Sequence, residues 1–120
     1  MNATEGTFEV ISSDLGKGVA RLRVAGEADL WTAPELKAAL AAAIDRGSRS
    51  VVVDLSETTF LDSTALGVLM GGVRRLKPKR GEIVIVCRDA NIRKIFEITL
   101  LDRIFVIASE MDEALDHLGL

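Results

Sequence analysis

The stretch that decides the fold is VVVDLSETTFLDSTALGVLM, residues 51–70. It opens on an unbroken apolar run, Val51–Val53, of the kind found in strands that are buried on both faces of a parallel sheet. The polar residues after Asp54 predict a loop, and a helical period follows from about Ser63 to Lys77. The order of buried strand, polar loop and helix indicates a βα unit.

The helix predicted at residues 63–77 is apolar on nearly all sides, so we expect it to be the most buried helix of the protein. Gly71 and Gly72 lower its intrinsic helix propensity, which suggests that a neighbouring element approaches it closely. Its core-facing stripe consists of Leu66, Leu69, Val73 and Leu76.

Further strands are predicted on both sides of this unit. Residues 19–25 alternate between apolar side chains and arginines, which indicates a strand with one face in water. A first strand is expected at Thr7–Ser12, joined to it by a glycine-containing turn at residues 16–18. Two further apolar runs, Ile83–Val86 and Ile104–Ile107, are expected to be central parallel strands.

Three more helices complete the pattern. The first is predicted to begin at a T-x-x-E capping box formed by Thr32 and Glu35 and to end at Gly47. Another is expected at Asn91–Thr99, and a last one follows Ser109, where acidic residues favour a helix N-terminus. We therefore expect a single α/β domain over residues 1–120, with a mostly parallel sheet and an extra N-terminal strand.

Composition limits the chemistry of the chain. Its 120 residues include one cysteine, Cys87, and one histidine, His117, which argues against a disulfide framework, a metal site or a catalytic cluster. The 15 Lys and Arg residues against 18 Asp and Glu give a net charge of −3, which argues against nucleic-acid binding. The first residues, MNATEGTFEV, lack the features of a secretory signal, and no apolar run could span a membrane. We therefore expect a soluble, cytoplasmic protein that is not an enzyme and uses no cofactor.

A hydroxyl pair, Ser63 and Thr64, begins the helix that follows the buried strand. The first-turn amides of a helix have no partners within it and carry partial positive charge, so a phosphate on Ser63 would be favoured there. Thr64 is the second candidate acceptor. The alternative interpretation is that Ser63 or Asp62 only caps the helix, which serine and aspartate commonly do.

Three stretches of the sequence resemble the STAS domain family, in the order and spacing of that family. The central one is DLSETTFLDSTALGVL, residues 54–69; RVAGEADLWTAPELKAAL, residues 23–40, precedes it, and IRKIFEITLLDRIFVIASEMDEAL, residues 92–115, follows it. Together they cover almost the whole chain. They look like the anti-sigma factor antagonists of the SpoIIAA type, which implies a βα superhelix with an extra N-terminal strand.

The resemblance also implies a function. Such proteins bind a partner that is both a serine kinase and an anti-sigma factor; the unphosphorylated form binds and frees a sigma factor, and the phosphorylated form cannot bind. By position Ser63 takes the role of phosphate acceptor, Asp62 is its acidic neighbour, and Asp29 matches an aspartate near the acceptor on the same surface. A phosphatase is the further expected partner, whereas nucleic acid and membranes are not expected partners.

Ala65 and Leu100 depart from the family pattern. Many relatives carry glycine in place of Ala65, and the family often has glycine in place of Leu100. Leucine fits poorly in the left-handed conformation that commonly ends a helix, so we expect the helix before Leu100 to end differently here. Trp31, close to Asp29, is either an anchor for the partner or a side chain that covers the core beside the capping box. The expected partner-binding surface consists of Asp29, Trp31, Asp62, Ser63 and Thr64.

Two other functions compete with this one. A STAS scaffold that binds partners without being phosphorylated has the same sequence features, because an acceptor serine can be present and unused. A receiver domain phosphorylated on Asp54 would need an acidic pair after its first strand and a lysine after its last strand, and the sequence has neither.

Overall fold

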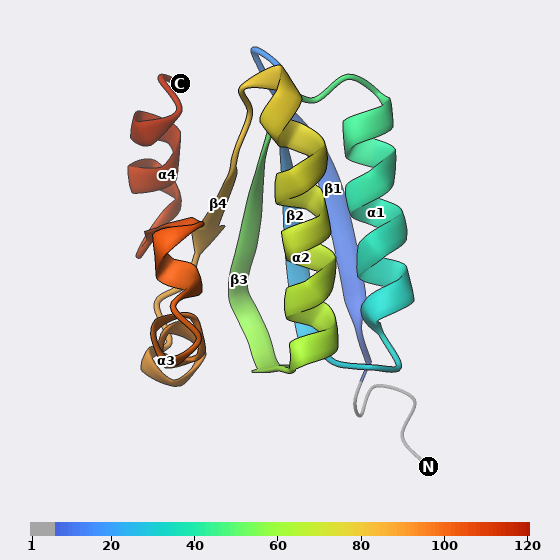
Figure 1. Ribbon diagram of the computed structural model, residues 1–120, viewed down its shortest axis with the longest axis vertical. Helices are drawn as coiled ribbons and strands as arrows, with labels where there is room; N and C mark the ends of the chain where they lie inside the picture. Colours follow the sequence, from blue (N-terminus) through green and yellow to red (C-terminus); the bar gives the residue numbers. More distant parts are fainter. Residues whose placement is uncertain (1–6) are drawn as a thin grey trace.

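The computed structural model describes residues 7–120, which form a five-stranded sheet with helices on both of its faces (Figure 1). The strands lie in the order β1-β2-β3-β4-β5; β1 runs antiparallel to β2, and the other neighbours are parallel. The strands are β1 (Glu9–Gly16), β2 (Val19–Ala28), β3 (Ser50–Leu61), β4 (Ile83–Val86) and β5 (Val106–Ala108). The helices are α1 (Ala33–Asp45), α2 (Ser63–Leu76), α3 (Ala90–Ile98) and α4 (Met111–His117).

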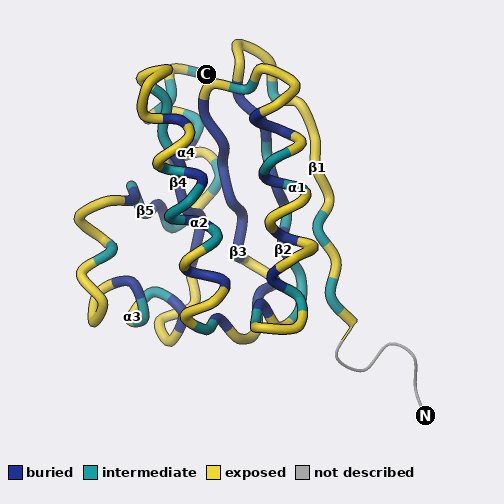
Figure 2. The backbone as a smooth tube through the Cα atoms, turned by 45° about the vertical axis from the view of Figure 1, so that its right-hand side comes forward, coloured by how far each residue is buried: buried dark blue, intermediate teal, exposed yellow. Residues whose placement is uncertain are grey.

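The order of the strands explains where the helices lie. Each new parallel strand is added on the same side of the previous one, so right-handed crossovers bring α1, α2 and α3 to the same side of the sheet, where they share the main core. After β5 the chain crosses to the other face, where α4 covers β4 and β5 through Ala114. The central strands β3 and β4 are buried along most of their length, whereas β1 is an exposed edge (Figure 2). This confirms the predicted βα architecture with an extra N-terminal strand.

The alternation predicted for residues 19–25 is confirmed, because Leu22 and Val24 are fully buried while the arginines between them point to the other face. β4 has the predicted limits. β1 begins and ends later than predicted, because it stays paired with β2 up to a tight turn in which Lys17 and Gly18 both have positive φ. β5 begins two residues later than predicted and ends one residue later, because Ile104 caps the 3-10 turn before it. The prediction that it is a central strand is wrong, since β5 is the edge strand next to β4 and two of its three residues are only half-buried.

β3 departs most from the prediction. The sequence predicts a loop after Asp54, but the strand continues to Leu61 and stays paired with β2 through two register shifts. Polar residues are tolerated there because they find partners: Thr58 Oγ1 donates a 2.9 Å hydrogen bond to the Val24 carbonyl, and Glu57 forms an ion pair with Arg23. The extension carries the chain to the far end of β2.

The capping box predicted for α1 does not form. Thr32 has helical backbone angles, and its hydroxyl makes no cap bond to the helix. Thr32 Oγ1 instead accepts a 2.8 Å hydrogen bond from the Asp29 N–H and donates a 2.7 Å bond to the Glu27 carbonyl. The threonine therefore stabilises the turn that precedes α1.

The expectations for α2 are only partly confirmed. α2 exposes a smaller share of its residues than α1, but the margin is small, because both helices have five buried residues and lie on the sheet with one side at the surface. The predicted close approach exists at Gly72, where an added Cβ would lie 2.6 Å from Leu40 Cδ2 and 2.9 Å from Ile83 Cδ1. The prediction of a close approach is wrong for Gly71, where an added Cβ would meet nothing within 4 Å.

The expectation that α3 ends differently at Leu100 is also wrong. Leu100 follows the end of the helix with φ +62° and ψ +15°, which is the left-handed conformation usually taken by glycine at this place. Leucine adopts it because the chain must turn here into the segment that buries Phe105 against Phe96, whose rings meet edge to face at 5.7 Å.

Replacing Leu100 by glycine is expected to stabilise the protein by about 0.5–1 kcal/mol, because the left-handed conformation costs a non-glycine residue about 1–2 kcal/mol and glycine loses part of this gain to chain entropy. Leu100 is 55% exposed, so little packing is lost. Urea denaturation measures the change. The matched control is Ile98→Gly, which is expected to destabilise, since Ile98 is exposed and helical. A loss of stability in Leu100→Gly would contradict the prediction.

Candidate functional site

The candidate site lies at the end of the sheet where β2 and β3 finish and α1 and α2 begin (Figure 1). Leu61 is in register with Ala28, and the Asp62 N–H donates a 3.0 Å hydrogen bond to the Ala28 carbonyl. The loop at residues 29–32 and the start of α2 are therefore neighbours, although they are about thirty residues apart in the sequence.

Asp62 connects these two segments. Its Oδ1 accepts hydrogen bonds from the backbone N–H groups of Thr64 at 2.9 Å and Ala65 at 3.1 Å, which confirms that Asp62 caps α2. Its Oδ2 accepts a 3.0 Å hydrogen bond from the Leu30 N–H. One carboxylate thus fixes the position of Leu30 relative to the first turn of α2.

Ser63 is the first residue of α2 and is exposed, and its hydroxyl has no hydrogen-bond partner within residues 7–120. Two of the first-turn amides that the sequence analysis expects to be free are already bonded, because Asp62 occupies the N–H groups of Thr64 and Ala65. A phosphate on Ser63 would therefore lie beside a carboxylate without these amides to neutralise it.

Asp29 shapes the neighbouring loop. Its Oδ1 accepts hydrogen bonds from the N–H groups of Trp31 at 2.9 Å and Thr32 at 3.1 Å. The loop holds Trp31 with 85% of its surface exposed, which overturns the interpretation that this ring covers the core. Leu30 beside it is 61% exposed. Because Leu30 is bonded to Asp62, this apolar surface lies next to the start of α2.

Leu30 and Phe60 belong to the same end of the sheet and are not identified by the sequence pattern. Phe60 is 48% exposed and lies just before the end of β3, whereas the next residue, Leu61, is buried. Adjacent strand residues point to opposite faces of the sheet, so Phe60 and Leu61 cannot both face the core, and one of them faces outward. The pattern alone does not tell which one, since aromatic residues in strands are usually buried.

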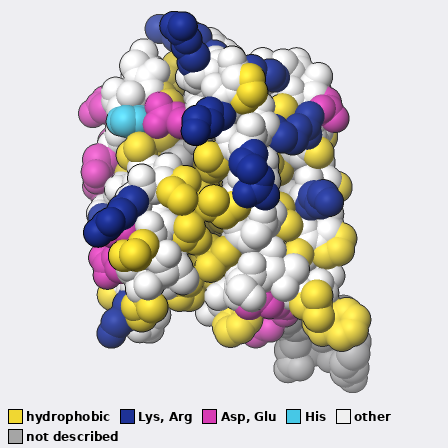
Figure 3. All heavy atoms as spheres, viewed as in Figure 1, with side chains coloured by type: hydrophobic (Ala, Val, Ile, Leu, Met, Phe, Trp, Pro, Cys, Tyr) yellow, Lys and Arg dark blue, Asp and Glu magenta, His cyan; other side chains and the backbone are white. Residues whose placement is uncertain are grey.

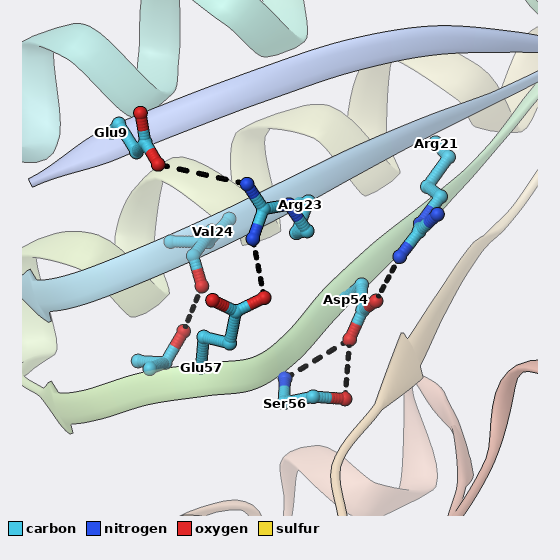
Figure 4. A network of polar contacts seen from close by, with 8 residues as sticks. Glu9, Arg21, Arg23, Val24, Asp54, Ser56 and Glu57 are labelled. Atoms are coloured by element: carbon cyan, nitrogen blue, oxygen red, sulfur yellow. Dashed lines mark hydrogen bonds and ion pairs between the residues drawn. The ribbon is translucent and has the colours of Figure 1, made fainter.

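A second polar network lies on the sheet face opposite α1 and α2, apart from this surface (Figure 4). The carboxylate of Asp54 is 6% exposed and accepts a 2.7 Å bond from Arg21 Nη2. It also accepts bonds from the Ser56 N–H at 3.0 Å and the Ser56 hydroxyl at 2.6 Å. Burial by itself raises the pKa of Asp54, but the Ser56 hydrogen bonds and the Arg21 ion pair outweigh it and hold this pKa below its usual value.

The Asp54 network predicts a pH dependence of stability. The pKa of Asp54 is lower in the folded than in the unfolded protein, so its stabilisation is complete above the unfolded value of about 3.9 and is lost as the pH falls through the folded value. Asp54→Asn is expected to reduce this loss of stability at acid pH, which we call the acid limb of the pH dependence. It is also expected to lower stability at pH 7 by about 2 kcal/mol, because Arg21 loses its charged acceptor.

Denaturation in urea at a series of pH values from 7 to 3 measures both effects. Glu57→Gln is the matched control, because it removes a more exposed partner of the neighbouring Arg23 and is expected to have a smaller effect. An acid limb that is equally steep in Asp54→Asn and in the unmodified protein would contradict the assignment.

The described residues hold no group of three or more histidine, cysteine, aspartate or glutamate side chains that could bind a metal ion. Over the same part of the chain, none of the helices is both long and apolar enough to cross a membrane. Cys87 is a fully buried free thiol, and burial raises its pKa, so it serves as the small core residue that the sequence predicts.

Comparison with known proteins identifies the family. The model of a family described as "Mlab, STAS domain" matches residues 11–108. The anti-sigma-B factor antagonist of Listeria monocytogenes is 37% identical over 84 residues, which are 70% of this chain and 74% of that protein. The anti-sigma-B factor antagonist of Staphylococcus aureus is 35% identical over 78 residues, which are 65% and 72% of the two chains.

Solved structures show the same relationship. An anti-sigma factor antagonist from Mycobacterium paratuberculosis superimposes with a TM-score of 0.87 at 28% identity, over 99% of this chain and 100% of that one. Unphosphorylated SpoIIAA shares the fold, with a TM-score of 0.77 at 21% identity over 95% and 98% of the two chains. The chain therefore belongs to the STAS domain family. Within that family it resembles the bacterial anti-sigma factor antagonists of the SpoIIAA type.

Proposed function

We propose that this protein is an anti-sigma factor antagonist that binds an anti-sigma factor with serine kinase activity, and that phosphorylation of Ser63 ends this binding. The observation that carries the proposal is the setting of Ser63: an exposed hydroxyl without a hydrogen-bond partner in the described chain, next to Asp62 and to the exposed side chains of the 29–32 loop. The names of the relatives support the first part.

The unphosphorylated surface suits a protein partner. Trp31 and Leu30 offer exposed apolar area on a loop that is fixed by hydrogen bonds to Asp29 and Asp62, so little conformational entropy is lost when they are covered. A neutral hydroxyl at Ser63 can be buried in such a contact if the partner supplies one hydrogen bond.

Phosphorylation changes this surface by charge. A phosphate adds about −1.5 to −2 charges at neutral pH, and on Ser63 it stands beside the Asp62 carboxylate. The amides of Thr64 and Ala65 are already bonded to Asp62, so they do not neutralise the new charge. The phosphate would therefore repel acidic groups of the partner and would lose its hydrating water in the contact. A phosphatase acting on this exposed position would return the protein to the binding form.

The experiment is a phosphorylation assay. The anti-sigma factors of the source organism are purified one at a time and incubated with this protein and ATP, and the phosphate is located by mass spectrometry. We expect one of them to modify Ser63, with no modification in Ser63→Ala and full modification in the control Thr64→Ala. Phosphate on Thr64, or on no residue with any of these kinases, would refute the phosphorylation part; tight binding without phosphorylation would favour a scaffold.

A further inference from the structure

A groove of about 500 Å³ separates α1 from α2 on the side that faces away from the sheet. Its floor is apolar and consists of Leu40, Ala41, Ile44, Gly67, Val68 and Gly71. Thr64, the neighbour of Ser63, lines one end, and Arg74 and Arg75 line the other. The groove therefore begins at the Ser63 surface and follows α2 for most of its length.

The charged side chains along this groove are all positive. They are Lys37 from α1 and Arg74 and Arg75 from α2, and no acidic side chain from residues 7–120 lines the groove. Arg75 is paired with Asp45 at 2.6 Å, while Lys37 and Arg74 form no ion pair with any residue between 7 and 120. Figure 3 shows Lys and Arg side chains gathered over the upper half of α1 and α2, with Asp and Glu mainly at the margins of this face. This face is therefore positive although the protein as a whole has a net charge of −3.

The depth of the groove comes from two glycines that the fold itself does not need. An added Cβ at Gly67 or Gly71 would meet nothing within 4 Å, whereas one at Gly72 would collide with Leu40 and Ile83. Glycine within a helix is less favourable than alanine by about 1 kcal/mol, so these two positions weaken α2 without an internal packing reason. Their effect is to open the floor to a close approach from outside.

We propose that this groove binds an acidic amphipathic helix of the anti-sigma factor, with its apolar face on Gly67 and Gly71 and its carboxylates at Lys37 and Arg74. The proposal rests on the proposed function, because a partner that covers Ser63 reaches the groove through Thr64. The positive rim selects acidic side chains by charge complementarity. From Thr64 to Arg75 the helix rises by roughly 16 Å, which matches about three turns of a helix lying alongside it.

An isolated acyl chain fits this groove less well. Ligand sites for small apolar molecules bury most of the ligand, but this groove is open to water along α2, where Gly67 is exposed and Val68 and Gly71 are only partly covered. A helix that belongs to a partner protein is shielded from water on its outer side by the rest of that protein. Small side chains on the floor let the two helix backbones approach closely, which strengthens dispersion contacts.

The test measures the affinity of the anti-sigma factor that binds the unmodified protein. Lys37→Glu with Arg74→Glu is expected to raise its Kd by about thirtyfold. The control is Lys17→Glu with Lys94→Glu, which makes the same change in net charge at two exposed positions outside the groove and is expected to change the Kd less than about threefold.

A second variant separates the groove from overall stability. Gly71→Leu fills the floor. Because an added Cβ at Gly71 meets nothing within 4 Å and the position lines the groove, the melting temperature is expected to stay equal or rise while the Kd rises at least about tenfold. If an anti-sigma factor binds the unmodified protein and both groove variants equally well, the groove proposal fails alone. If no anti-sigma factor binds the unmodified protein, the proposed function fails as well. Flotation with phosphatidylglycerol vesicles that is lost in the groove variants, with partner binding unchanged, would assign the groove to lipid and overturn the proposal.

Discussion

Ser63→Asp is expected to weaken binding of the anti-sigma factor by at least about a hundredfold, which corresponds to roughly 3 kcal/mol. Two effects combine at this position. The exposed Ser63 hydroxyl is replaced by a charge that must be desolvated in the contact, and this charge lies next to Asp62, whose own carboxylate is already committed to three backbone N–H groups. The aspartate charge at position 63 would be repelled by the Asp62 carboxylate and would lose its hydration when the partner covers it.

Ser63→Asn is the matched control for this prediction. Asparagine has nearly the shape of aspartate without its charge, so it separates size from electrostatics, and it is expected to lose less than about tenfold in affinity. Titration calorimetry of both variants with the anti-sigma factor measures the difference at low salt, and the gap between them is expected to narrow as salt is added. Equal affinities for the aspartate and asparagine variants would show that charge at Ser63 does not control binding.

The sequence pattern predicts the elements of this fold where side-chain periodicity and burial agree. The alternation of Leu22 and Val24 with two arginines defines β2, and the run Ile83–Val86 defines β4, because burial on one or both faces leaves a direct trace in hydrophobicity. It does not predict the second half of β3. There the polar side chains are satisfied by partners on β2, such as Arg23 for Glu57, and these are distant in sequence.

The candidate surface shows the same division. Ser63 and Asp62 are found from the sequence, because a helix N-terminus after a buried strand has recognisable signals. The hydrogen bond from the Leu30 N–H to Asp62 is not predictable, since it depends on how far β2 and β3 extend before both chains turn. The exposure of Trp31 also depends on this turn, because Thr32 bonds to Asp29 and Glu27 instead of capping α1.

Gly81 marks the point of closest backbone contact among the described glycines. An added Cβ there would lie 1.6 Å from the Arg49 carbonyl oxygen and 2.7 Å from its carbonyl carbon. Neither chain can move easily: the Arg49 N–H donates a 2.7 Å bond to Gly18, and the Gly81 N–H donates a 3.0 Å bond to Leu76. The two segments lead directly into β3 and β4, where Val51 is in register with Ile83. Relief of the clash must therefore displace the start of two central strands.

Gly81→Ala is expected to destabilise the protein by about 3 kcal/mol or more, because a clash between an added methyl group and the backbone cannot be relieved by rotating a side chain. Gly71→Ala is the matched control: the same methyl group meets open space within α2 and is expected to stabilise the protein by up to about 1 kcal/mol. Urea denaturation of the two variants measures this opposition in sign. Midpoints that shift equally in both would mean that the segments before β3 and β4 are not held against each other, and that the register of the central sheet does not depend on Gly81.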